Sequence, residues 1–138
     1  MENTDGSVQD HPIPSNYRHI SVEDRDGVLV VRFIDLRREL GNTVSCQETY
    51  QEFRMLASHH HKCLVVLDLE GQEVSATEVF FCYLVRLDRE VKQVQGTLKL
   101  CNLSPLVAED MRTIRLNWMF RTYNSLDDAL ASDVTELG

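Results

Sequence analysis

The sequence has no strong positive charge and no long apolar run, and both absences exclude classes of function. Its 138 residues carry 14 lysines and arginines against 22 aspartates and glutamates, a formal net charge of −8. A nucleic-acid binder needs a basic surface that neutralises phosphates, so we expect no nucleic-acid partner. No apolar run approaches the ~20 residues of a membrane-spanning helix, and residues 1–16 lack the apolar core of a secretion signal. We therefore expect a cytoplasmic protein with no membrane partner.

Cysteines are few and widely spaced. Cys46, Cys63, Cys82 and Cys101 lie 17 to 19 residues apart and form no Cys-x-x-Cys pair, whereas a zinc site normally shows close ligand pairs. We interpret all four as small buried hydrophobic residues with reduced thiols. The three consecutive histidines 59–61 would point in different directions from a helix and could not converge on one ion. We expect no metal site.

The motifs of common catalytic sites are also missing. The sequence contains no Gly-rich phosphate loop of either the G-x-x-x-x-G-K-[ST] or the G-x-G-x-x-G type, and no G-x-S-x-G nucleophile elbow. Asp68, in an apolar segment, could be a catalytic carboxylate, but no partner base or nucleophile accompanies it. A polar residue in such a strand also commonly caps a neighbouring loop. We expect no enzyme, no catalytic residue and no cofactor.

What the chain does contain is typical of one globular domain. A hydrophobic content of 43% and a charged content of 26% are ordinary values, and 138 residues suffice to bury one core. Residues 1–16 are polar and include two prolines, so we expect a disordered tail there. The predicted domain spans residues 17–133, and residues 134–138 form a C-terminal tail.

Strand signals recur along this domain. Asp26-Gly27 lies between the β-prone runs "HISVEDR" and "VLVVRF", which predicts a tight hairpin. The apolar run "CLVVLDL" is typical of a strand buried on both faces. Two later segments, "TLKLCNL" and "WMFRTY", predict further strands. The connections between them are long enough to hold helices.

Helix start signals alternate with these strands. Serines with an acidic residue three positions later, or with a following proline, mark four helix starts: Ser45, Ser75, Ser104 and Ser125. The second of these helices should end near Gly96. The order β-β-α-β-α-β-α-β-α predicts an α/β domain, a mixed four- to five-stranded sheet covered by about four helices. Such sheets bind ligands beyond the carboxyl ends of their strands, which points to the loop after Leu69.

Several segments together resemble the STAS domain, the fold of anti-sigma factor antagonists. They are "LVVLDLEG", "LVRLDREVKQVQGTLKLCNLSPLV" and "WMFRTYNSLDDAL", and with the hairpin they extend over about residues 18–132. The resemblance implies a non-enzymatic signal-transduction protein that regulates transcription by partner switching. The implied partner is a kinase-type anti-sigma factor or a related regulatory kinase or phosphatase. Phosphorylation at the start of the second helix would break the complex.

The phosphoacceptor is open among three interpretations. The family pattern here is Asp-Ser-Ser-Gly, whereas this chain has Ser75-Ala76-Thr77-Glu78. Counting forward from "LDLEG" places Glu78 on the usual acceptor, and a shift by one residue places Thr77 there. Ser75 and Thr77 could only cap the helix, one of them could be phosphorylated, or Glu78 could supply a standing negative charge.

We expect the partner to bind this loop and the following helix turn. The predicted partner-binding residues are Glu70, Gly71, Gln72, Ser75, Thr77, Glu78 and Phe81, with Thr77 and Ser75 as phosphoacceptor candidates. We expect Phe81 to face outward as an apolar anchor, although a buried helix face is the competing interpretation. The alternative function is a STAS domain that senses a small ligand, a nucleotide or a lipid, without phosphorylation. The oligomeric state stays open.

Overall fold

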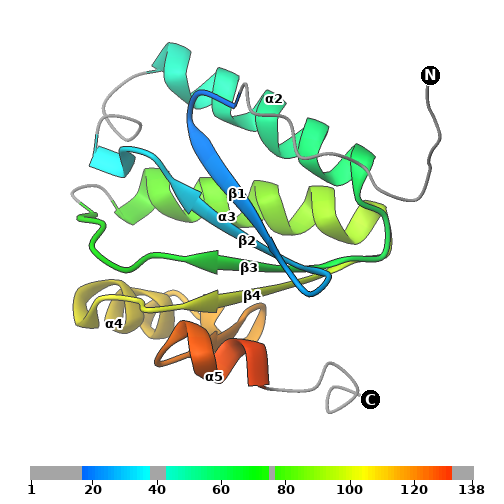
Figure 1. The fold of residues 1–138 in the computed structure, drawn as a ribbon. Coiled ribbons are helices and arrows are strands. Elements are labelled where there is room, and N and C mark those ends of the chain that lie inside the picture. Colours follow the sequence, from blue (N-terminus) through cyan, green and yellow to red (C-terminus); the bar gives the residue numbers. More distant parts are fainter. Residues whose placement is uncertain (1–16, 38–42, 75–76, 132–138) are drawn as a thin grey trace, which may run out of the picture.

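The computed structural model describes residues 17–37, 43–74 and 77–131, without the side chains of residues 43–45. The two predicted tails and Ser75 lie outside the described residues, so the domain boundaries stay predictions. Figure 1 shows one sheet with helices on both sides of it. Among the described helices none is both long enough and apolar enough to cross a lipid bilayer.

Within the described residues, the sheet has five strands whose order in space equals their order in the sequence. Neighbouring strands pair in parallel except for the first two, which form an antiparallel hairpin. The strands are β1 (Ile20–Arg25), β2 (Val28–Phe33), β3 (Leu64–Asp68), β4 (Thr97–Cys101) and β5 (Arg121–Tyr123). The predicted mixed sheet is confirmed. The hairpin turn is the predicted Asp26-Gly27, with positive φ angles of 54° and 90° that match a two-residue turn of this kind.

The helices follow the predicted order. They are α2 (Thr43–His59), α3 (Thr77–Gln93), α4 (Pro105–Thr113) and α5 (Leu126–Ala131), with a 3₁₀ turn η1 (Leu116–Trp118) before β5. Two predicted caps are confirmed, because the Val107 N–H donates to Ser104 Oγ (3.2 Å) and the Asp128 N–H donates to Ser125 Oγ (3.1 Å). The cap predicted at Ser45 is wrong, since α2 already begins at Thr43.

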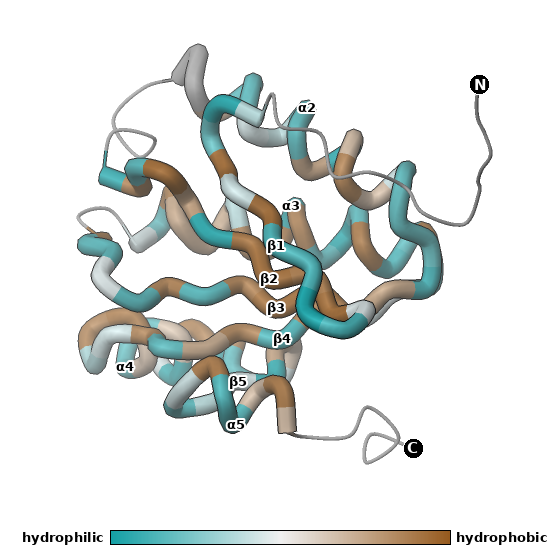
Figure 2. The backbone as a smooth tube through the Cα atoms, in the orientation of Figure 1, coloured by the Kyte–Doolittle hydropathy of each residue, from teal (hydrophilic) through white to brown (hydrophobic). Residues whose placement is uncertain are grey.

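The strand pleat divides the core into two clusters. On β3, Val65 and Leu67 join the larger cluster, which also receives side chains from α2, α3 and α4. Val66 points to the opposite face and packs in a smaller cluster with Cys101 and with Ala129 of α5. In Figure 2 the strands in the middle of the sheet are largely brown, and the β1–β2 turn is teal. Both faces of β3 are therefore buried, as its apolar run predicted.

The end of α3 has a different cause from the predicted glycine stop. Gln95, not Gly96, takes the left-handed conformation, with φ of 66°. Gly96 is needed for space, since a Cβ there would lie 2.7 Å from the Cys63 carbonyl oxygen and 2.8 Å from Val91 Cγ1. Its N–H donates to the Val91 carbonyl (2.9 Å) and closes the helix end. This turn feeds the chain directly into β4.

The cysteines differ in exposure. Cys101 is buried, and burial together with the neighbouring Asp68 carboxylate raises the pKa of its thiol to about 12. Cys46 and Cys63 are half-buried. The expected burial is wrong for Cys82, which is exposed on the outer side of α3. Its position there places it in a surface hollow described below.

Candidate functional site

The loop after β3 lies at the carboxyl edge of the sheet, between β3 and the start of α3 (Figure 1). The loop begins at Leu69, which is held in place because its side chain is buried and its N–H donates to the Cys101 carbonyl (3.1 Å). Gly71 has a φ of 77°, which favours glycine, and its surroundings leave open space around the Cα. Glu70, Gly71 and Glu73 are exposed. The loop thus presents acidic side chains from a fixed base.

Asp68, the last residue of β3, organises this base. Its Oδ1 accepts hydrogen bonds from the Glu70 N–H (3.0 Å) and from Asn102 Nδ2 (2.8 Å). Its Oδ2 accepts from Arg32 Nε (3.0 Å) and lies 2.9 Å from Arg32 Nη2. The side chain is only 1% exposed. The contacts of Asp68 are therefore those of a residue that caps the loop after its strand.

The ionisation of Asp68 reflects two opposed effects. Desolvation by burial raises the pKa of this carboxyl group, whereas the hydrogen bonds from Asn102, the Glu70 N–H and Arg32 lower it. The hydrogen bonds prevail, so the pKa of Asp68 lies below its ordinary value. Asp68 is therefore a permanent anion at neutral pH, bound to its donors.

Gln72 connects the loop to the end of β2. Its Oε1 accepts from the Leu36 N–H (3.1 Å), and its Nε2 donates to the Phe33 carbonyl (3.3 Å). The sequence indicated Gln72 only as a partner-binding residue, and the structure adds that both ends of its amide support the fold. Next to it, Arg37 and Glu73 form an exposed ion pair at 3.4 Å. The loop is thereby fixed at both of its sides.

A polar hollow of about 240 Å³ separates this loop from the residues after β2. It is lined by Ile34, Asp35, Arg37, Gly71, Gln72 and Glu73. Ile34 is 52% exposed at its edge, and sequence reasoning missed it. The sequence shows only that an apolar residue follows a predicted strand directly, and this does not predict whether its side chain is buried or exposed. The hollow joins Ile34 to the predicted partner-binding loop.

The start of α3 holds the remaining predicted residues. Thr77 is the first helical residue and is half-buried, and Glu78 is exposed in the first turn, where a negative charge is favourable. The expected outward position of Phe81 is wrong. Its side chain is 6% exposed and packs on Phe80 with ring centroids 6.0 Å apart. A helix packed this closely on a sheet buries adjacent residues on a broad face, so both phenylalanines belong to the core.

The histidines at the end of α2 serve the helix. His59 Nδ1 lies 2.8 Å from the Met55 carbonyl and His60 Nδ1 lies 2.9 Å from the Leu56 carbonyl, which caps two of the last carbonyl groups. Within residues 17–37, 43–74 and 77–131, no group of three or more histidines, cysteines, aspartates or glutamates could hold a metal ion. These side chains thus have a structural role at the helix end.

Comparison with known proteins gives structural neighbours only. The sequence matches no protein-family model and no curated protein sequence. The chain is similar to an anti-sigma-factor antagonist (STAS) domain protein from Planctomyces limnophilus, with 25% identity and a TM-score of 0.67 over 80% of this chain and 94% of that chain. It is also similar to the crystal structure of a Thermotoga maritima protein assigned as an anti-sigma factor antagonist. That likeness has 12% identity and a TM-score of 0.58, and covers 83% of this chain and 93% of that chain.

The second likeness, at such low identity, concerns the fold alone, whereas the first covers most of both chains at higher identity. Both agree with the predicted resemblance and with the mixed sheet and the helices that the described residues form. The chain therefore has a STAS-like fold.

Proposed function

We propose that this chain is a non-enzymatic regulatory domain that acts as an anti-sigma factor antagonist by binding a protein partner. The observation that carries the proposal is the likeness to the Planctomyces limnophilus anti-sigma-factor antagonist domain, at 25% identity over most of both chains. The partner in this proposal is a kinase-type anti-sigma factor or a related regulatory kinase or phosphatase. Partner binding would then switch the availability of a transcription factor.

The exposed surface around the β3–α3 loop supports a docking role. Glu70 and Gly71 are exposed on the loop, and Glu78 is exposed in the first turn of α3. Ile34 adds an exposed apolar side chain across the hollow from them. An apolar anchor surrounded by polar groups is a common arrangement at protein interfaces. We therefore add Ile34 to the proposed partner-binding residues.

Phosphorylation is proposed as the control, with Thr77 as the first candidate acceptor and Ser75 as the second. Thr77 is the first residue of α3, where unpaired backbone N–H groups stabilise a phosphate. The phosphate would add almost two negative charges next to Glu78, in a stretch of sequence that also holds Glu70 and Glu73. The phosphate is strongly hydrated, and docking would have to remove that water or leave the group at the interface. This cost would weaken the complex.

The docking proposal is tested by a matched pair of substitutions. Ile34 and Ile114 are each 52% exposed, but Ile114 follows α4, outside the proposed surface. We expect Ile34→Asp to weaken binding to the cognate anti-sigma factor by about tenfold or more, measured by titration calorimetry. Ile114→Asp should leave the affinity within about twofold. If Ile114→Asp weakened binding and Ile34→Asp did not, the proposed surface would be wrong.

The control by phosphate is tested separately. The chain is incubated with its partner kinase and ATP, and the labelled residue is mapped by mass spectrometry in the parent chain and in Thr77→Ala and Ser75→Ala. We expect one of the two variants to lose the label and the labelled parent to bind its partner more weakly. Stable binding with no label on either residue would refute phosphorylation control but would leave the docking proposal standing.

A further inference from the structure

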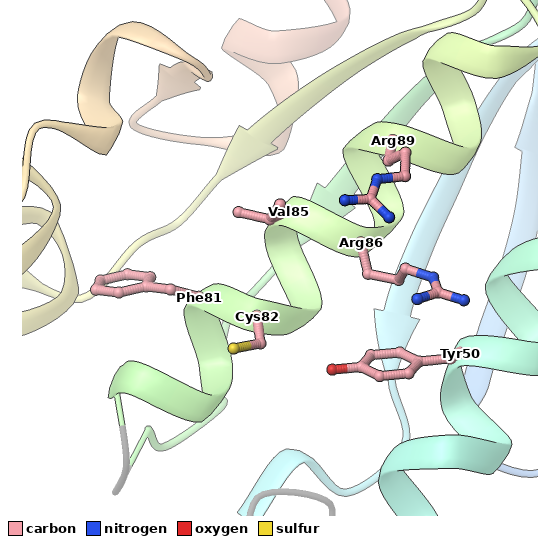
Figure 3. A pocket seen from close by; sticks show the side chains of 6 residues that line it. All are labelled: Tyr50, Phe81, Cys82, Val85, Arg86 and Arg89. Atoms are coloured by element: carbon pink, nitrogen blue, oxygen red, sulfur yellow. The ribbon is translucent and has the colours of Figure 1, made fainter.

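A groove between α2 and α3 combines an apolar end with a cationic end. The apolar end is a hollow of about 300 Å³ lined by Tyr50, Phe81, Cys82, Val85, Arg86 and Arg89 (Figure 3). A second hollow of about 450 Å³ shares Arg86 and Arg89 and continues toward the end of the helices. Its other lining residues are Arg54, Ala57, Ser58, Glu90, Gln93 and Val94. We call the two together the α2–α3 groove.

The charge of the groove is opposite to that of the chain. Its lining holds three arginines and one glutamate, a local charge of +2, in a chain of net charge −8. Arg86 is held in place, because its Nε donates to Glu90 Oε2 (3.2 Å) and its guanidinium carbon lies 5.0 Å from the centre of the Tyr50 ring. The guanidinium is therefore ordered before any ligand arrives, which lowers the entropy that binding costs.

Arg89 and Arg54 hold the charge that is available to a ligand. Both are exposed, and no carboxylate among the described residues lies within salt-bridge distance of either. An arginine guanidinium binds carboxylates and phosphates through two parallel hydrogen bonds. The cationic end can thus take one anionic head group, with Arg86 as the fixed member and Arg89 as the adjustable one.

The apolar end has room for a chain of carbon atoms. Figure 3 shows Phe81 and Val85 pointing to one side of α3, Cys82 pointing from a neighbouring face of the same helix, and Tyr50 reaching from α2 to lie beside Arg86. Its volume is at the lower limit of the ~300–1,000 Å³ typical of small-molecule sites. The lining residues of this end all belong to helices, whose backbone groups are bonded within the helix, so an extended peptide would find no main-chain partners there.

We propose that the α2–α3 groove binds a small amphipathic anion, an unbranched apolar chain that ends in a carboxylate or a phosphate. The apolar chain covers Phe81, Cys82 and Val85, and the head group lies between Arg86 and Arg89. The proposal does not depend on the partner-binding function, because it concerns a different surface and a ligand that can be added alone. Since Phe81 lies one turn after Thr77, the bound ligand also contacts the helix turn next to the proposed phosphoacceptor.

The test compares head groups on one chain length. Octanoate, octyl phosphate, octanol and octylamine are titrated separately at pH 7 into the full chain, and binding is mapped by amide chemical shifts. We expect octanoate or octyl phosphate to shift amides of α2 and α3 along the groove, and the comparison between these two identifies the preferred head group. Octanol should bind about fivefold more weakly, and octylamine more weakly still.

Substitutions then separate charge from packing. Arg89→Gln should weaken binding of the anionic probe about fivefold and leave octanol binding unchanged, and Cys82→Asp should weaken the anionic probe by at least as much. The matched control is Arg121→Gln, an exposed arginine on β5 that lines neither hollow, and it should leave both affinities unchanged.

Three results would overturn the proposal. The first is equal affinity for octanoate and octylamine, and the second is unchanged octanoate binding in Arg89→Gln. The third is a change in the chemical shifts of the groove amides when the chain is concentrated without any probe, together with the loss of their response to octanoate. A second copy of this chain would then occupy the groove.

Discussion

Asp68 makes the sharpest stability prediction, because one buried carboxylate accepts from three separate segments. It connects the Glu70 N–H of the loop, Asn102 after β4 and Arg32 of β2. Asp68→Asn preserves the shape of the side chain but removes the charge and turns one acceptor into a donor. That new NH₂ group must face either Asn102 Nδ2 or the Arg32 guanidinium, and both are donors.

The magnitude follows from the fate of each donor. A hydrogen bond to a charged group contributes about 1.5–3 kcal/mol, and a buried donor left without an acceptor costs about 1–3 kcal/mol. Arg32 is 35% exposed and Glu70 is exposed, so water can rehydrate part of what is lost. The desolvation cost of the Asp68 charge also disappears, which offsets a further part. We therefore expect Asp68→Asn to lower the free energy of unfolding by about 2 kcal/mol.

The same carboxylate makes the difference depend on pH. Because the pKa of Asp68 is lower in the folded chain than its unfolded value of about 3.9, its contribution is complete well above pH 4. The contribution declines as pH falls through the unfolded value toward the depressed folded pKa, since the unfolded chain takes up the proton first. The stability gap between the parent chain and Asp68→Asn should be constant from pH 7 to about pH 5 and should narrow below about pH 4.

Urea denaturation followed by circular dichroism at about pH 7, 5 and 3 measures this gap, and hydrogen exchange of the Glu70 amide reports the lost bond directly. Asp26→Asn is the matched control, because Asp26 is exposed in the hairpin turn at a φ of 54° that asparagine also accepts. It should change stability by less than about 0.5 kcal/mol. An Asp68→Asn chain as stable as the parent, or a gap that ignores pH, would refute the assignment of Asp68 as the anionic centre of the loop base.

Three further substitutions test other contacts, each by urea denaturation. Gln72→Ala should cost about 1–2 kcal/mol and accelerate exchange of the Leu36 amide, whereas an unchanged amide would show that the Gln72 contact does not hold the loop. Gly96→Ala should cost about 1–3 kcal/mol, because its Cβ would meet the Cys63 carbonyl at 2.7 Å, and a neutral effect would mean that the turn yields freely. Ser104→Ala should cost about 1 kcal/mol and Ser104→Asp should recover most of it, and equal losses would contradict the cap.

The fold could be predicted because its signals are local. The Asp26-Gly27 turn and the Ser104 cap depend on residues a few positions apart, and the structure has both. The apolar run of β3 identified a strand with two buried faces in the same way. Predictions were wrong where one short sequence pattern is compatible with more than one local structure. Ser45 with Glu48 fits a capping box, yet the helix starts two residues earlier.

The candidate site was harder to predict because its geometry joins distant segments. Gln72 is fixed by Leu36 and Phe33, residues 36 and 39 positions away in the sequence, and no local pattern announces such bonds. Ile34 directly follows β2 and is exposed there. The sequence alone does not distinguish an apolar residue that is buried at this position from one that is exposed. The error for Phe81 is the reverse. We expected a narrow apolar face of the helix that leaves Phe81 exposed, but the buried face of α3 is broad and includes it.

The exposure of Ile34 and the burial of Phe81 both move the apolar part of the proposed partner-binding surface toward β2. With Phe81 buried, the exposed apolar contribution to the proposed surface comes from Ile34 on the β2 side of the loop, not from α3. The loop residues between them are held by Asp68 and Gln72 at fixed positions, so Glu70 and Glu73 keep their charges on a rigid base. A partner that reads this surface would then contact both sides of the loop at once. Phosphate on Thr77 would act on its α3 side alone, which is why Ile34→Asp and phosphorylation of Thr77 should weaken binding independently and nearly additively.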